Sequence, residues 1–275
     1  MNELLVAVFD SEDAAVKGMH TLSDLHQEGD ISLYASALIV KGRDGNISVK
    51  QQSGERPLGF ALGLLTGGIV GLLGGPAGSA VGASLGGYIG LLADWARTGI
   101  DLKFLDDVGK TLSIGKAAVL AEIEESWASL LEPRLREEGG IVFRRFRTDV
   151  VEDQLLQESK ALQHQLEVLI NNLDKANNGL DRENAANREA LQKSIRDARQ
   201  QLETIGEQAN AAIDLKKTET DLKVKALLRQ AETAAEDAKT RIQKRVADTE
   251  ADFEMRQKKL TQARELAKGL TLPAN

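Results

Sequence analysis

Short apolar runs and helical patterns alternate along residues 1–150. The apolar runs have the length and the β-branched content of strands, and they lie at 4–9, 31–40, 47–49, 117–123 and 141–146. Between the first two runs, apolar residues from Ala14 to Leu25 recur every three or four positions, which predicts a helix that ends at Gly29. A second helical stretch covers 127–135. This order of elements predicts a domain of the α+β class.

The order of elements is repeated within this domain. A strand, a helix and the sequence Glu-Gly-Asp-Ile at 28–31 are matched later by a strand, a helix and Glu-Gly-Gly-Ile at 138–141. Two βαβ units in one sheet are typical of a ferredoxin-like sandwich. We therefore expect a ferredoxin-like fold for residues 1–57 together with 97–150.

A stretch without a charged residue interrupts this domain between Arg56 and Asp94. Ten of its glycines fall on two rows with four-residue spacing, which are Gly59, Gly63, Gly67, Gly71 and Gly75, then Gly74, Gly78, Gly82, Gly86 and Gly90. In water, each glycine costs a helix about 1 kcal/mol relative to alanine. In lipid, small residues at this spacing let two helices pack closely. We therefore predict that residues 58–96 form a glycine-zipper helical hairpin in a membrane.

The length of the uncharged stretch restricts how it meets a bilayer. Each predicted helix has roughly 17 residues and rises about 25 Å, slightly less than the ~30 Å hydrocarbon core. The hairpin therefore spans a locally thinned bilayer or enters it and returns, and both ends emerge on one side. Arg56, Arg97 and Lys103 flank it, which favours the cytoplasmic side of the inner membrane. A buried hairpin outside the membrane and a flexible glycine-rich loop are the alternatives.

Residues 151–275 are predicted to be helical nearly throughout, because apolar residues recur at heptad spacing and no proline occurs before Pro273. The coiled-coil seam includes Leu191, Ile195, Leu202 and Ile205. Alanine and polar residues weaken this seam for a tight dimer, so we expect many shallow contacts between copies of the chain. A helix break at Gly179 would give a helical hairpin, whereas an unbroken helix would give a rod, and the sequence leaves both open.

Composition excludes several kinds of chemistry. The chain has no cysteine, which excludes disulfides and thiolate sites, and its three histidines are too few for a histidine-rich metal centre. His20 and His26 are six residues apart and therefore lie on different faces of the first helix. The net charge of -7 gives no general attraction to nucleic acid. We expect a protein that is not an enzyme, holds no cofactor or metal, and does not bind nucleic acid.

A basic cluster on the last strand is a candidate for lipid binding. Arg144, Arg145 and Arg147 lie within four positions of one another. Basic side chains near a membrane surface attract anionic lipid headgroups by roughly 1 kcal/mol each. The alternative is a solvated strand edge whose charges prevent aggregation.

Several motifs of the first half occur together in one known family. They are Val-Phe-Asp at 8–10, Asp-Gly at 44–45, Asp-Trp-Ala-Arg-Thr-Gly-Ile-Asp at 94–101 after the glycine rows, and Gly-Gly at 139–140. With them, residues 1–150 resemble a bacterial membrane-protein family known as domain of unknown function 1269. The resemblance implies membrane association and a stress-related role, and it supplies no reaction or catalytic residues. The long helical region lies outside it.

These features predict three parts and one function. The parts are a ferredoxin-like domain at 1–57 and 97–150, a membrane hairpin at 58–96, and a helical coiled-coil assembly region at 151–275. The predicted function is a non-enzymatic, membrane-associated scaffold whose partners are the lipid bilayer and further copies of the chain. An oligomeric membrane pore and a small-molecule-sensing stress protein are the alternatives.

Overall fold

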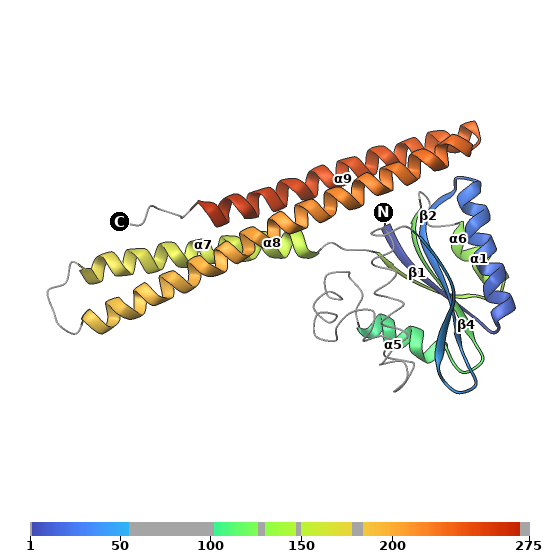
Figure 1. The fold of residues 1–275 in the computed structure, drawn as a ribbon, viewed down its shortest axis with the longest axis horizontal. Helices are drawn as coiled ribbons and strands as arrows, with labels where there is room; N and C mark the ends of the chain where they lie inside the picture. Colours follow the sequence, from blue (N-terminus) through green and yellow to red (C-terminus); the bar gives the residue numbers. More distant parts are fainter. Residues whose placement is uncertain (1, 55–101, 126–129, 147–149, 178–183, 270–275) are drawn as a thin grey trace. The chain divides into compact units, whose positions relative to one another are not determined.

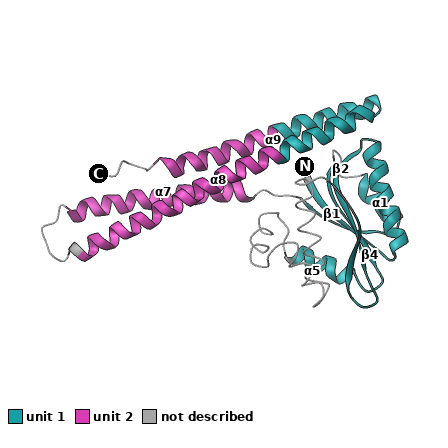
Figure 2. Cartoon of the chain, viewed as in Figure 1, with its two compact units in different colours: residues 1–149, 219–250 teal, residues 150–218, 251–275 magenta. Residues whose placement is uncertain are grey.

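The computed structural model describes residues 2–54, 102–125, 130–146, 150–177 and 184–269 (Figure 1). The chain divides into two compact units (Figure 2). Unit 1 contains residues 1–149 and 219–250, and unit 2 contains 150–218 and 251–275. The sequence had suggested one helical region from residue 151 onward, whereas residues 219–250 pack with the sheet domain.

Five strands of unit 1 form one antiparallel sheet. They are β1 (Asn2–Phe9), β2 (Ile31–Lys41), β3 (Ile47–Gly54), β4 (Ala117–Glu125) and β5 (Ile141–Phe146), and their order is β3-β2-β4-β1-β5. Three helices belong to the same domain, namely α1 (Glu12–Gln27), α5 (Leu102–Thr111) and α6 (Leu131–Glu137). The α+β class predicted from the sequence is confirmed.

The two βαβ units interleave, as the repeated pattern predicts. Strand β4 lies between β1 and β2 of the first unit, and β1 lies between β4 and β5 of the second. The turns that end the two helices also correspond. Gly29 and Gly139 both have positive φ, +73° and +82°, and the following N–H group donates to the carbonyl of Leu25 in one turn and of Leu135 in the other. Both helices therefore end in the same glycine-dependent C-terminal turn.

The sheet buries both faces, which explains its continuous apolar strands. Helices α1 and α6 cover one face, where Phe9, Leu22 and Leu135 belong to a single apolar cluster. Helix α5 packs on the other face, where Phe104 and Val6 share a second cluster (Figure 1).

The predicted membrane hairpin at 58–96, with all of its row glycines, lies outside the described residues. The elements that bound it belong to one core, because Ile47 of β3 and Leu105 of α5 are members of the same apolar cluster. Among the helices that the structure describes, none is both long and apolar enough to cross a membrane.

The rest of the described chain is three long helices, which are α7 (Val150–Asn177), α8 (Asn184–Thr233) and α9 (Glu236–Lys268). In unit 2, Leu166 of α7 packs against Ile195 and Leu202 of α8. The helices on either side of residues 178–183 therefore contact each other, which favours the helical hairpin over the continuous rod.

The predicted seam is covered within the chain. Ile195, Leu202 and Ile205 are buried, and Leu191 is half-buried. Ile205 packs between α7 and α9, in a cluster that contains Leu156 and Leu260. The heptad pattern therefore identifies the face of α8 that is buried in its own chain, and assembly through this seam stays a prediction.

We expect Leu202→Ala to lower the free energy of unfolding of unit 2 by about 2–5 kcal/mol, because Leu202 is 2% exposed and its loss leaves a cavity. Leu215→Ala is the control on the same helix, since Leu215 is 54% exposed. Urea denaturation followed by circular dichroism measures both. Equal effects of the two substitutions would contradict the packing described for α8.

Candidate functional site

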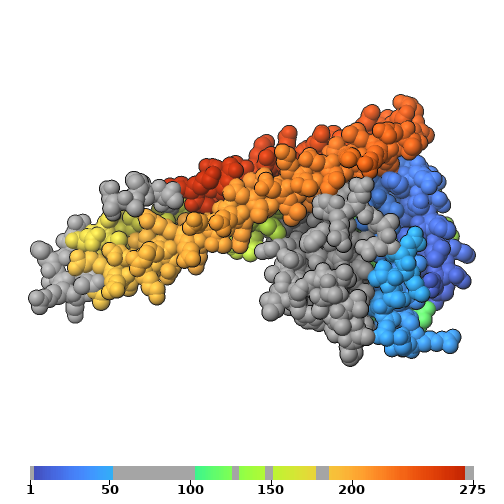
Figure 3. Space-filling view, viewed as in Figure 1, coloured from blue at the N-terminus to red at the C-terminus, as the bar shows by residue number. Residues whose placement is uncertain are grey.

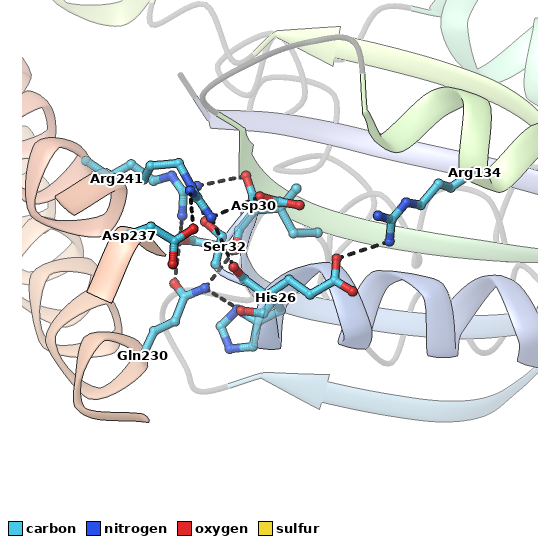
Figure 4. Close-up of polar contacts among 11 residues, drawn as sticks. His26, Asp30, Ser32, Arg134, Gln230, Asp237 and Arg241 are labelled. Atoms are coloured by element: carbon cyan, nitrogen blue, oxygen red, sulfur yellow. Dashed lines mark hydrogen bonds and ion pairs between the residues drawn. The ribbon is translucent and has the colours of Figure 1, made fainter. Parts of the chain in front are cut away.

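The end of the α8–α9 pair, residues 219–250, packs on the sheet domain within unit 1, and we call these residues the tip. In the space-filling view, the orange tip lies against the dark blue segment that contains α1 (Figure 3). Part of the contact is apolar, because Tyr34 of β2 joins Leu227, Ala238 and Ile242 in one buried cluster. The rest consists of hydrogen bonds between tip side chains and the turn that links α1 to β2 (Figure 4).

Gln230 connects the tip to both ends of this turn. Its amide nitrogen donates to the carbonyl oxygens of His26 at 2.7 Å and Ile31 at 2.8 Å, and its amide oxygen accepts from the Ser32 hydroxyl at 2.6 Å. Gln230 is 7% exposed. Because both ends of its amide are bonded, the orientation of this side chain is fixed.

Two arginines of α9 donate hydrogen bonds to backbone carbonyls of the same turn. Arg245 is 2% exposed and donates to the carbonyls of Gly29 and Asp30, both at 2.7 Å. It also donates to the Ser32 hydroxyl at 2.8 Å. Arg241 donates to the Glu28 carbonyl and to the Asp30 carboxylate, both at 3.2 Å. The last carbonyls of a helix lack intrahelical partners and carry partial negative charge, so arginine side chains suit this position.

The backbone of Gly29 approaches the tip closely. A methyl group on Gly29 would lie 2.6 Å from Cβ of Ala238, closer than two carbon atoms can pack. At Gly139, the equivalent residue of the second repeat, a methyl group would have no neighbouring atom within 4 Å. Of these two equivalent turns, the first is the one against which a helix packs.

The sheet surface under the tip is polar. The Tyr34 hydroxyl donates to the Glu124 carboxylate at 2.6 Å, and Lys223 of α8 lies 5.6 Å from the centre of the Tyr34 ring. Burial raises the pKa of Tyr34 well above its ordinary value, and the Glu124 carboxylate raises it further. Burial lowers the pKa of Arg245, and the charge of Glu124 opposes this effect. Glu124 therefore binds the protonated tyrosine and compensates the buried cation.

The candidate headgroup arginines have partners in their own sheet. Arg144 donates to the carboxylates of Glu3, at 2.7 Å, and Glu125. Burial acts to lower the pKa of Arg144, but hydrogen bonds with these two carboxylates raise it. The Arg145 guanidinium lies 5.8 Å from the centre of the Phe104 ring. Arg147 lies outside the described residues, and lipid binding by this cluster stays a prediction.

The described residues contain no group of three or more His, Asp or Glu side chains placed to hold a metal ion. The hydrogen bonds between the tip and the turn that follows α1 form the candidate site in the described part of the chain. The sequence prediction missed Gln230, Arg241 and Arg245, since helical polar residues of these types are usually solvated. The Glu-Gly repeat at 28–29 identified the turn but not its partner.

Residues 61–180 match the model of a family described as "Protein of unknown function (DUF1269)". The resemblance found from the motifs is confirmed, although the matched range begins and ends later than expected. It includes α5, β4, α6 and β5, and it extends through α7. The comparison with curated proteins gave no match, and neither did the comparison with solved structures.

We expect Gly29→Ala to destabilise unit 1 more than Gly139→Ala. Both alanines must adopt a positive φ, which costs about 1–2 kcal/mol. Only the methyl group at Gly29 meets the tip, and overpacking adds about 1–3 kcal/mol. Urea denaturation of both variants measures the difference, and equal midpoints would show that the tip does not pack on this turn in solution.

Proposed function

We propose that the chain is a non-enzymatic, membrane-associated scaffold. In this proposal, a ferredoxin-like sheet domain is attached to the bilayer by a glycine-zipper hairpin inserted between β3 and α5. The α8–α9 pair is attached to the same domain through the tip. Copies of the chain associate with one another at the membrane.

The observation that carries the proposal is where the uncharged stretch leaves and rejoins the fold. Strand β3 ends at Gly54 and α5 begins at Leu102, and both elements contribute to one apolar cluster on one sheet. A segment held at both ends by one folded domain has to enter and leave a bilayer on the same side. A hairpin of two helices satisfies this requirement, because it returns the chain to the side of the bilayer from which it entered. The lack of charge between Arg56 and Asp94 suits the lipid interior.

The glycine rows support association inside the membrane. Since the α8 seam packs against α7 and α9 of its own chain, it leaves few large apolar side chains for assembly in the described helices. The rows at Gly63-Gly67-Gly71 and Gly82-Gly86-Gly90 provide small residues at the spacing that close helix contact in lipid requires. We therefore place the contact between copies in the hairpin and not in the seam.

The first experiment removes the hairpin. We expect replacement of residues 58–93 by a short Gly-Ser linker to abolish flotation with liposomes, because the linker has no apolar surface to bury in lipid. Circular dichroism of the variant checks that the sheet domain stays folded. If a folded variant floats as well as the full chain, the hairpin is not the membrane anchor.

The second experiment compares neighbouring glycines. We expect Gly67→Leu to reduce the mass of the detergent-solubilised assembly, because a side chain on the row separates the helix backbones. Gly68→Leu adds the same side chain one position away, off the row, and should leave the mass unchanged. Light scattering coupled to size-exclusion chromatography measures both. Ion conductance of the wild-type assembly in planar bilayers would favour the pore instead of the scaffold.

A further inference from the structure

His26 connects the last turn of α1 to both β2 and the tip. Its ring atom Nδ1 accepts a hydrogen bond from the backbone N–H of Leu33 at 3.3 Å. Its backbone carbonyl accepts from Gln230, and the side chains of both residues lie at the same polar contact (Figure 4). Because a backbone N–H can only donate, Nδ1 must carry a lone pair, so this arrangement requires a ring that is not protonated at Nδ1.

Charged groups approach this contact from several elements. Helix α9 contributes Asp237, Arg241 and Arg245, and the turn contributes Asp30. From the sheet come Glu124 and the Tyr34 hydroxyl, while Glu28 is paired with Arg134 of α6 at 3.1 Å. The charge that acts on His26 most clearly is the guanidinium of Arg245. A protonated imidazole would therefore stand beside a buried cation.

Two effects compete at His26. The negative end of a helix dipole favours a protonated histidine in the last turn. Here Gln230 and Arg241 already donate to the carbonyls of His26 and Glu28 at the end of this helix. Burial lowers the pKa of His26 below its ordinary value of 6.5, Arg245 lowers it further, and a hydrogen bond with the Ile31 backbone opposes both.

Protonation would also break specific bonds. A proton on Nδ1 removes the acceptor that the Leu33 N–H uses. The Ile31 carbonyl already accepts from Gln230, and its second lone pair can accept the new N–H, which is the contact that opposes the lowering of the His26 pKa. The protonated ring therefore shares an acceptor with Gln230 of the tip, while the positive charge of Arg245 in the tip repels it.

We propose that His26 makes the docking of the tip sensitive to acid, so that the neutral ring holds the tip on the sheet and the protonated ring loosens it. Release of the tip would uncover a polar surface that contains Ser32, Tyr34 and Glu124. This inference concerns unit 1 alone and does not depend on membrane insertion or on assembly.

The direction in which pH changes the docking of the tip follows from the lowered pKa of His26. A histidine whose pKa is lowered in the docked state favours docking fully above its ordinary value of 6.5, and this contribution is lost as the pH falls below 6.5. Each pH unit below that value favours the released tip by up to about tenfold, until the pKa of the docked state is reached.

The experiment measures the distance between the tip and α1 in the full chain. The chain has no cysteine, so spin labels can be attached at Lys17→Cys on α1 and Glu232→Cys on α8, two exposed positions. Double electron–electron resonance should give one narrow distance distribution at about pH 7.5 and a longer, broader one at about pH 5. An unchanged distribution would overturn the proposal.

Two histidine variants test whether His26 causes the pH-dependent change in distance. In His26→Asn, the amide oxygen takes the place of Nδ1 as acceptor but does not titrate, so the narrow distribution should persist at low pH. His20→Asn changes the exposed histidine of the same helix and should respond to pH as the unsubstituted chain does. An equal response of the two variants would overturn the proposal, because Glu3 and Glu152, whose pKa values burial raises, titrate in both.

If the His26→Asn variant does not fold, a pH titration of the unsubstituted chain tests the same proposal. Nuclear magnetic resonance of the imidazole ring of His26 should place its pKa below the ordinary value of 6.5. Loosening of the tip should follow the titration of His26. If His26 titrates at its ordinary value of 6.5, the ring is not held neutral by the docked tip and the proposal fails.

Discussion

The contact between the tip and the sheet domain depends on the hydrogen bonds made at the end of α1 and in the turn that follows it. A helix leaves its final carbonyls without intrahelical partners. Here Gln230 donates to the His26 carbonyl in the last turn, and Arg241 donates to the carbonyl of the C-cap residue Glu28. Arg245 donates to the Gly29 carbonyl in the turn that follows, so all three donors come from a part of the chain some two hundred residues away. Loss of one partner in a buried network costs more than one hydrogen bond gains, because the remaining group stays desolvated. The polar groups of this contact are therefore costly to separate, and their hydrogen bonds help the apolar cluster around Tyr34 to keep the sheet surface beneath the tip buried.

This contact also limits what the rest of the chain can do. The tip covers the polar end of one sheet face, α5 packs on the same face, and α1 with α6 covers the other. In unit 2, the apolar seam of α8 is occupied by α7 and α9. Since the large apolar surfaces of the described residues are mostly used within one chain, contacts with lipid and with other copies are best sought in the uncharged stretch.

Local patterns predicted the elements well, and long-range contacts poorly. The apolar runs gave the strands, and the repeated Glu-Gly turn gave the interleaved βαβ units, because both signals depend on neighbouring residues. The heptad spacing identified the buried face of α8, which includes Leu202. Such spacing predicts which face of a helix is buried, but it does not predict which helix packs against that face. Arg245 could not be distinguished from solvated arginines, because its burial depends on carbonyls at Gly29 and Asp30. In the same way, the sequence did not show that Arg144 pairs with Glu3, which lies on another strand.

The interleaved strands determine the order of synthesis and folding. In the centre of the sheet β1 pairs with β4, so that Phe9 lies opposite Ala117, and the whole uncharged stretch is translated between them. The pairing has a long loop to close, and contacts of this range form late in folding. During synthesis, the apolar segment therefore leaves the ribosome before the sheet can close around its ends. The segment is therefore accessible to lipid or to another protein before the domain that holds its two ends has folded.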